Sequence, residues 1–194
     1  MKGRDTMSTN PHYFWAVRLP DGTKRTIHDE MKKLGHIFRF KRWVHMGDYH
    51  ITLAFLGAVE KHRLADVVEL VGNAIKEAES FPLRIEGLDL FGNQTAPRIF
   101  WAAVNEDERL FRLQKIIHHA CLEVGFTLED RPYHPHITLA RKWEADEAFE
   151  RELLVRHNPF RDAPLAFEVK DIVLYRTNVE KTPKYEAVAT FSIG

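Results

Sequence analysis

The sequence predicts an α+β fold of two pseudo-twofold-related lobes, in which antiparallel sheets line a central cleft and helices pack outside them. Three observations support this fold class. The five-residue string HITLA occurs at 50–54 and again at 136–140, in a chain without low-complexity segments. Each half of the chain combines strand-like segments, an amphipathic helical segment and one copy of this string. The copies lie 86 residues apart, a period too long and a copy number too low for a solenoid.

The first half begins with an expected strand, a helix and a second strand. The apolar run YFWAVRL at 13–19 is rich in aromatic and branched residues, and PDG at 20–22 ends it with a turn. A helix is expected from about Thr23 to Leu34, because Gly35 follows. The segment DYHITLAFLG at 48–57 is rich in Ile, Thr and Phe, which favours a strand.

Two longer helices are expected where apolar residues recur three and four positions apart, the spacing of an amphipathic helix. The first covers 64–78, and the second covers 110–124 with Gly125 at the usual place of a left-handed cap. Between them, FPLRIEGLDLFG at 81–92 and RIFWAAV at 98–104 indicate two strands joined by a turn.

The remaining segments follow the second HITLA copy. A short helical stretch is expected near 146–156, and LAFEVKDIVLYRTNV at 165–179 and YEAVATFSI at 185–193 are expected to close the chain as strands. The first residues, 1–11, are polar and end in proline, which indicates a flexible N-terminal leader. A single bilobal domain is then expected over 12–194.

Composition limits the function further. The 194 residues are 44% hydrophobic and 29% charged, which is typical of a globular domain. The sequence has no run of about 18 apolar residues and no signal-peptide pattern at its start, so no membrane association and a cytoplasmic location are expected. Cys121 is the one cysteine and falls on the apolar stripe of a predicted helix, which indicates a buried thiol in a reducing compartment.

Charge argues against one class of partner. Lys plus Arg and Asp plus Glu both number 28, so the formal net charge is zero. A protein whose main role is to bind a long phosphate backbone without sequence preference would be basic. The stretch RFKRW at 39–43 is a candidate basic patch, although the solvated edge of a strand is the favoured interpretation.

The repeated string itself predicts a site. Residues two apart in a strand project to the same face, so His50 and Thr52 project together, and so do His136 and Thr138. Duplication explains the apolar Ile and Leu of each copy as core residues, but it gives no reason to keep both polar pairs. Two such strands facing each other would line a cleft with two imidazoles and two hydroxyls.

Those groups suit displacement at phosphorus without a metal. One imidazole can act as a base and the other as an acid, while threonine hydroxyls donate to the non-bridging phosphoryl oxygens. A metal site at His134 and His136 is a minor alternative, since no third ligand stands at a recognisable spacing. The adjacent His118 and His119 are expected to be solvent-exposed helical residues. Neither a glycine-rich phosphate loop nor a nucleophile motif is present.

The chain resembles the 2H phosphoesterases, and most closely the bacterial and archaeal RNA 2′,3′-cyclic phosphodiesterases first described as 2′-5′ RNA ligases. The resemblance runs from about Tyr13 to Ile193. It rests on FWAVRLP, RWVHMGDYHITLAFLG, LFGNQTAPRIFWAAV, GFTLEDRPYHPHITLAR and LYRTN with PKYEAVATFSI. The resemblance implies a hydrolase that opens a terminal 2′,3′-cyclic phosphate on RNA to a 2′-phosphate, without a cofactor or metal.

The resemblance also implies residue roles. His50 would donate a proton to the leaving oxygen, His136 would accept one from water, and Thr52 and Thr138 would hold the phosphate. Arg141 matches the basic residue that closes the second motif in this family. Strict strand alternation would turn it away from the histidine, so its role as a phosphate ligand requires a bulge or the end of the strand.

Phe55 occupies the position in the first copy that Arg141 occupies in the second. We expect this residue to form an apolar wall facing a base. The expected partners are RNA ends or short oligonucleotides that carry the cyclic phosphate, bound by a monomer. Two alternatives are a 2′-5′ RNA ligase, which runs the same chemistry backwards, and an RNA-end-binding module without turnover.

Overall fold

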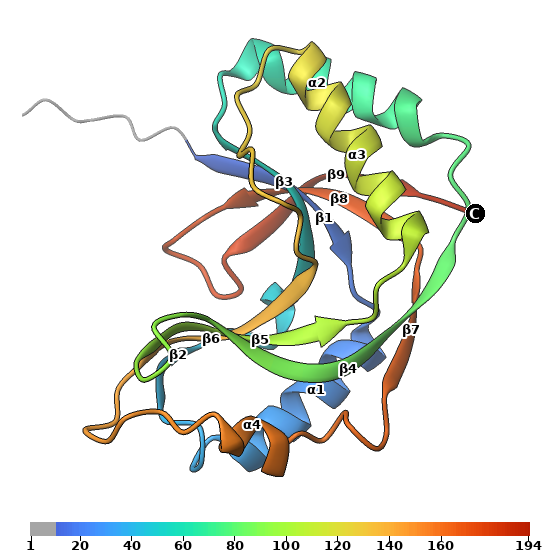
Figure 1. Cartoon of the computed structure of the whole chain (residues 1–194). Helices are drawn as coiled ribbons and strands as arrows, with labels where there is room; N and C mark the ends of the chain where they lie inside the picture. Colours follow the sequence, from blue (N-terminus) through green and yellow to red (C-terminus); the bar gives the residue numbers. More distant parts are fainter. Residues whose placement is uncertain (1–10) are drawn as a thin grey trace, which may run out of the picture.

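The computed structural model describes residues 11–194, which form two antiparallel sheets with helices on their outer faces (Figure 1). Of the predicted leader, 1–10 lie outside the described residues. The strands are β1 His12–Arg18, β2 Phe40–Trp43, β3 His50–Ala58, β4 Phe81–Gly92, β5 Pro97–Val104, β6 His136–Trp143, β7 Leu165–Val169, β8 Asp171–Thr177 and β9 Tyr185–Ser192. The helices are α1 Asp21–Leu34, α2 Lys61–Ile75, α3 Glu108–Glu123, α4 Glu152–Arg156 and the 3-10 turn η1 Met46–Asp48.

The predicted pseudo-twofold relation is visible in the strand order. One sheet runs β3-β1-β8-β9, and the other runs β2-β6-β5-β4-β7. Apart from the added edge strand β2, the two orders match strand for strand, with β3 equivalent to β6 and β1 to β5. Each HITLA strand therefore pairs with an equivalent neighbour, antiparallel in both lobes. The predicted α+β class with two related lobes is confirmed.

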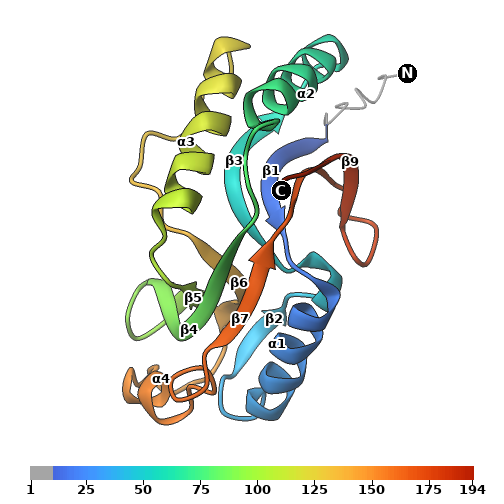
Figure 2. The same cartoon turned by 90° about the vertical axis from the view of Figure 1, so that its right-hand side faces the viewer.

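The helices leave the inner faces of the sheets free for the cleft. In Figures 1 and 2, α2 and α3 lie side by side over the sheet that contains β3, whereas α1 and α4 lie over the other sheet. The contact between α2 and β9 is close, because a Cβ added at Gly72 would come within 2.7 Å of the Phe191 ring. Gln114 of α3 donates to the Leu53 carbonyl of β3 at 3.3 Å.

The core supports each HITLA strand from behind. Ile51 and Leu53 of β3, and Ile137 and Leu139 of β6, are almost fully buried in one apolar cluster. Burying a side chain of this size contributes roughly 1.5–3 kcal/mol. This burial fixes which face of each strand turns inward, so the His and Thr of each copy face away from the core. Cys121 is also buried, as predicted.

Three predicted element boundaries were wrong. The helix expected from Thr23 begins at Asp21, and only Glu152–Arg156 of the stretch expected at 146–156 is helical. The preceding backbone is used in tertiary contacts, since Phe149 donates its N–H to the Thr95 carbonyl at 2.7 Å. The run at 165–179 is not one strand, because β7 pairs with β4 in one sheet and β8 pairs with β1 in the other.

Two other sequence features have ordinary structural roles. The basic stretch at 39–43 forms the edge strand β2, where Lys41 pairs with Glu144 at 2.8 Å and Arg39 with Glu147 at 3.3 Å. Exposed His119 pairs with Glu123 at 3.2 Å on the surface of α3. None of the helices in residues 11–194 is long and apolar enough to cross a membrane.

Candidate active site

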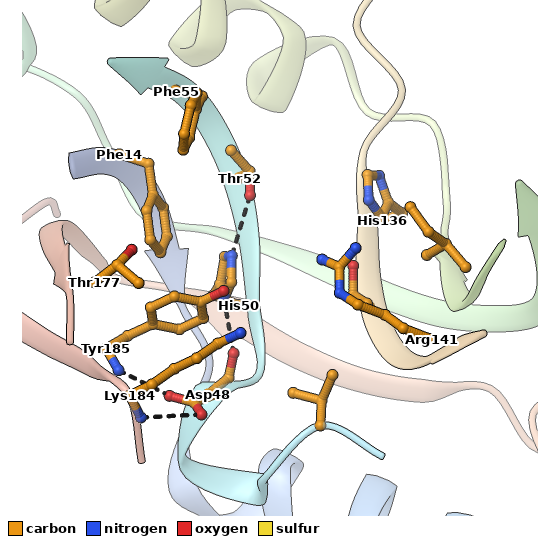
Figure 3. Close-up of a pocket in the computed structure, with 13 residues that line it drawn as sticks. Phe14, Asp48, His50, Thr52, Phe55, His136, Arg141, Thr177, Lys184 and Tyr185 are labelled. Carbon is orange, nitrogen blue, oxygen red and sulfur yellow. Dashed lines mark hydrogen bonds between the residues drawn. The ribbon is translucent and has the colours of Figure 1, made fainter. Parts of the chain in front are cut away.

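A cavity of about 190 Å³ lies between the two HITLA strands. All five predicted site residues line it: His50, Thr52, His136, Thr138 and Arg141. Figure 3 shows His50 and Thr52 on β3 and His136 and Arg141 on the facing strand β6, with the cavity between them. The two copies are therefore close in space although they are 86 residues apart in sequence.

A bulge in each HITLA strand brings the sixth residue onto the cleft face. On β3, Ala54 and Thr52 oppose consecutive residues of β1, so Leu53 is an extra residue. On β6, Ala140 and Thr138 oppose consecutive residues of β5 in the same way. An extra residue reverses the alternation of side chains beyond it. Arg141 consequently lies on the same face of β6 as His136. The expected role of Arg141 as a phosphate ligand required this placement.

The same bulge brings Phe55 onto the cleft face of β3. Phe55 opposes Phe14 of β1, and Arg141 opposes Ile99 of β5. All four of these residues line the cavity. Equivalent positions of the two lobes thus present different side chains to the cleft. One lobe contributes the aromatic pair Phe14 and Phe55, and the other contributes Ile99 and the cationic Arg141.

Both histidines are oriented by a backbone carbonyl two residues before them. His50 Nδ1 lies 2.7 Å from the Asp48 carbonyl, and His136 Nδ1 lies 2.8 Å from the His134 carbonyl. A carbonyl oxygen only accepts, so Nδ1 carries the proton in both rings. Nε2 is then the atom of each imidazole that can take up or release a proton.

The two Nε2 atoms differ in their neighbours. His50 Nε2 lies 3.1 Å from Thr52 Oγ1, as the dashed line in Figure 3 marks. Since Nδ1 of the neutral ring holds the proton, the Thr52 hydroxyl donates to Nε2. Within residues 11–194, the Thr138 hydroxyl makes no such bond to His136.

Aromatic side chains surround each imidazole. The His50 ring lies 4.8 Å from the Phe14 ring and 5.2 Å from the Tyr185 ring, measured between centroids. The His136 ring lies 4.9 Å from Phe91 and 5.7 Å from Trp101. These contacts restrict ring rotation and reduce the water around both imidazoles.

This environment keeps His50 neutral. Burial is the main cause that lowers its pKa to about 4, and the positive charges of His136, Lys184 and Lys24 lower it further. The hydrogen bond to the Asp48 carbonyl acts in the opposite direction. At neutral pH the free protein therefore holds His50 as an uncharged imidazole with its lone pair on Nε2.

The pKa of His136 is lowered for the same main reason as that of His50. Burial lowers its pKa below the ordinary 6.5, followed by the charges of His134 and Arg141, while the His134 carbonyl opposes the change. Both imidazoles are thus set in a cleft whose positive neighbours disfavour protonation. A bound anion would favour the protonated form of an imidazole that lies close to it.

Seven cavity residues were not predicted as site residues: Phe14, Val44, Asp48, Ile99, Thr177, Lys184 and Tyr185. Phe14 was expected only as a strand residue. Because neighbouring strand residues point to opposite faces, a buried Trp15 on one face could have indicated that Phe14 lies on the cleft face. Lys184 lies in the connection between β8 and β9, and Tyr185 is the first residue of β9, far along the chain. Their contact with β3 depends on sheet pairing that no local pattern encodes.

Within the described part of the chain, no three His, Cys, Asp or Glu side chains are grouped to hold a metal ion. Cys121 of α3 lies in the hydrophobic core, and burial raises the pKa of its thiol to about 12. The polar residues that line the cleft are two histidines, three threonines, Arg141, Lys184, Asp48 and Tyr185.

Comparison with known proteins finds relatives that match most of the chain. The chain is 44% identical over 185 residues to an RNA 2′,3′-cyclic phosphodiesterase of Geobacillus stearothermophilus, covering 94% of this chain and 57% of that protein. It is 33% identical over 184 residues to the Bacillus subtilis protein of the same name, covering 95% of this chain and 97% of that protein.

Structural similarity extends the comparison to the fold. E. coli LigT solved with 3′-AMP superposes with a TM-score of 0.76 at 20% identity, covering 95% of this chain and 99% of that one. The sequence profile of the 2′-5′ RNA ligase superfamily matches residues 27–181, which include both HITLA strands and Arg141. The chain therefore belongs to the 2′-5′ RNA ligase superfamily.

Proposed function

We propose that this protein hydrolyses the terminal 2′,3′-cyclic phosphate of RNA to a 2′-phosphomonoester. The observation that carries the proposal is the meeting of two His-x-Thr strands at one cavity, each with its imidazole oriented by a carbonyl at Nδ1. Curated relatives at 44% and 33% identity are named RNA 2′,3′-cyclic phosphodiesterase, which supports this substrate class.

In the proposed reaction, His136 accepts a proton from water while the water oxygen attacks phosphorus. The bond between phosphorus and O3′ breaks, and His50 donates its proton to O3′. Thr52, Thr138 and Arg141 hold the non-bridging oxygens, whose charge is largest in the transition state. Exchange with solvent then returns each histidine to its starting protonation state.

The proposal requires His50 to take up a proton from solvent when substrate is bound. In the free protein the pKa of His50 is about 4, so the ring is neutral at pH 7. A phosphodiester anion within hydrogen-bond distance favours the imidazolium and offsets the positive charges of Lys184 and Lys24. The Thr52 hydroxyl, which donates to Nε2 in the free protein, becomes available to the phosphate once Nε2 is protonated.

No metal is needed in this mechanism, because two imidazoles supply the acid and the base while hydroxyls and a guanidinium hold the charge. We also propose that one bilobal domain of a monomer is sufficient, since a single chain contributes both strands. The cytoplasmic location expected from the sequence stays a prediction.

The identity of the product tests the proposal. A 5′-labelled oligonucleotide ending in a 2′,3′-cyclic phosphate is incubated with the protein in excess EDTA, and the product isomer is identified. We expect a 2′-phosphate at a rate that EDTA does not change. A 3′-phosphate would contradict the assignment of the leaving oxygen, and loss of turnover restored by zinc or manganese would contradict the metal-free mechanism.

A 2′-5′ RNA ligase is the second candidate, favoured by the superfamily that matches residues 27–181. In ligation the 5′-hydroxyl of a second RNA replaces water as the nucleophile. The bond between phosphorus and O3′ breaks as in hydrolysis, and a 2′-5′ phosphodiester forms. Including a second oligonucleotide with a free 5′-hydroxyl in the assay distinguishes the two, since ligation would give a longer labelled product. Complete absence of turnover would favour a module that only binds RNA ends.

A further inference from the structure

The cleft has a second cation that lies outside the duplicated strands. Arg141 lines the cavity beside His136, but its equivalent beside His50 is the apolar Phe55. Lys184 lines the cavity on the His50 side, where Figure 3 shows its side chain extending past Tyr185 toward His50. The connection between β8 and β9 thus supplies a positive charge that the first HITLA strand lacks.

Lys184 differs from the other cations of its hairpin. Arg176 and Lys181 both bind the carboxylate of Glu186. Within residues 11–194, Lys184 Nζ has no carboxylate at ion-pair distance; it lies 4.8 Å from the centroid of the Tyr185 ring. A half-buried lysine whose ammonium lies near an aromatic ring and not near a carboxylate retains most of its capacity to bind an anion.

A buried carboxylate fixes the backbone beneath this ammonium. Asp48 is only 6% exposed, and it accepts the backbone N–H of Lys184 at 3.2 Å and that of Tyr185 at 3.0 Å. The side-chain carboxylate of Asp48 is therefore engaged by these two backbone N–H groups. The backbone carbonyl of Asp48 accepts a hydrogen bond from His50 Nδ1. The same loop touches η1 closely, because a Cβ added at Gly47 would lie 3.0 Å from Pro183.

Asp48 consequently connects two parts of the site. It holds the start of β9 against the turn that precedes β3, so Lys184 keeps a constant position relative to His50. An ammonium on a restrained backbone loses less conformational freedom when it binds an anion than one on a free loop. The arrangement is that of a preorganised anion-binding group rather than a solvated surface lysine.

We propose that Lys184 binds a phosphate oxygen of the RNA substrate from the His50 side, opposite Arg141, and that Asp48 is the residue that positions it. The inference rests on the proposed function for the identity of the substrate. Two phosphates share this chemistry: the cyclic phosphate that reacts, and the phosphodiester that precedes it in the chain. Their contributions are separable, because a mononucleoside carries only the first.

The test compares Lys184→Met with Lys181→Met, which removes a cation from the same hairpin but leaves Arg176 on Glu186. The substrates are a mononucleoside 2′,3′-cyclic phosphate and an oligonucleotide with the same end. We expect Lys184→Met to lower kcat/KM roughly tenfold to hundredfold, the loss of one charge-assisted hydrogen bond. We expect Lys184→Arg to recover part of this loss and Lys181→Met to stay within about twofold of wild type.

The two substrates identify the phosphate. A loss on both would assign Lys184 to the reacting phosphate, and a loss on the oligonucleotide alone would assign it to the preceding phosphodiester. Unchanged kcat/KM on both would overturn the proposal. Thermal unfolding of each variant checks that the fold is intact, and Lys184→Arg covers the case in which Lys184→Met unfolds.

Binding separates this inference from the proposed function. The probe is a deoxyoligonucleotide ending in a 3′-phosphate, which has both phosphates but no 2′-hydroxyl and therefore cannot turn over. Isothermal titration should show several-fold weaker binding to Lys184→Met than to wild type or Lys181→Met, even if no cyclic phosphate is ever hydrolysed. Equal affinities of the three proteins would contradict the role of Lys184 while leaving the hydrolase proposal standing.

Discussion

The two HITLA strands have the same residues and the same bulge but different surroundings. In both, the imidazole is oriented by the carbonyl two residues earlier, and the bulge turns the sixth residue into the cleft. His50 is additionally enclosed by Phe14 and Tyr185 and bonded by Thr52, whereas His136 packs on Phe91 and Trp101.

This difference shows how one motif can serve two roles. The repeated string determines the backbone, the bulge and the direction of each His and Thr. The residues around each copy determine how strongly the pKa of its histidine is lowered and which charge stands beside it. In the proposed mechanism, an acid and a base would arise from identical five-residue segments because their neighbours differ.

The largest expected effect comes from removing either histidine. His50→Ala and His136→Ala should each lower kcat roughly 10²–10⁴-fold, the usual contribution of a positioned acid or base. The double variant should fall little further, because groups that act in one step are strongly non-additive. Steady-state kinetics on a cyclic-phosphate oligonucleotide measures this, with surface His119→Ala as the matched control. A variant with near-normal kcat and only a raised KM would make its strand a binding element.

The sixth residues of the two strands should respond differently. Arg141→Met removes a charged donor to the transition state and should lower kcat/KM roughly tenfold to hundredfold, mostly through kcat. Phe55→Ala should instead raise KM roughly tenfold with little change in kcat, because stacking on a base contributes to binding. Exposed Arg112→Met is the control for loss of charge. Equal kinetic signatures for the two variants would contradict the division of roles.

The threonines should show a smaller and subtler asymmetry. Thr52→Val and Thr138→Val should each lower kcat/KM about tenfold, since each removes one neutral donor to phosphate. Thr52→Val should also raise the pKa of His50, because its hydroxyl stabilises the neutral ring in the free protein. Kinetics and NMR titration of the histidine rings measure both effects. A pKa of His50 that does not respond to Thr52→Val would contradict the assigned donor.

The lowered pKa of His50 has a consequence for stability. The unfolded chain takes up a proton near pH 6.5, whereas the folded protein does so only near pH 4. Stability should therefore decrease as the pH falls from about 6.5 to about 4, by an amount on the order of 3 kcal/mol from this residue. Urea unfolding at several pH values should show this decrease, and His50→Gln should lose much of it. An identical pH dependence in the variant would mean that His50 is not the cause.

Much of this site was predictable from sequence because it depends on local rules. Strand parity fixes the faces of His50 and Thr52, and the burial of Ile51 follows from the same alternation. The repeat itself predicts that the second strand does the same. These rules also predicted the two-lobed fold, since equivalent segments build equivalent sheets.

The remaining features depend on contacts between distant segments. Sequence alone required a bulge or the end of the strand for Arg141 to face the cleft, and only the pairing of β5 with β6 reveals the bulge. Lys184 reaches the site because β9 lies two strands from β1 in its sheet and because Asp48 holds its backbone. The pKa of His50 depends on this packing, which no spacing of residues in the chain encodes.

The pH dependence of kcat/KM for wild type and the two histidine variants tests the central claim most directly. If one histidine must be protonated and the other neutral in the same displacement, wild type should give a bell-shaped profile. His50→Ala and His136→Ala, measured with the same cyclic-phosphate oligonucleotide in excess EDTA, should each lose one limb, and the limbs lost should be opposite ones. A variant that keeps both limbs, or two variants that lose the same limb, would contradict an acid–base pair formed by the two HITLA strands.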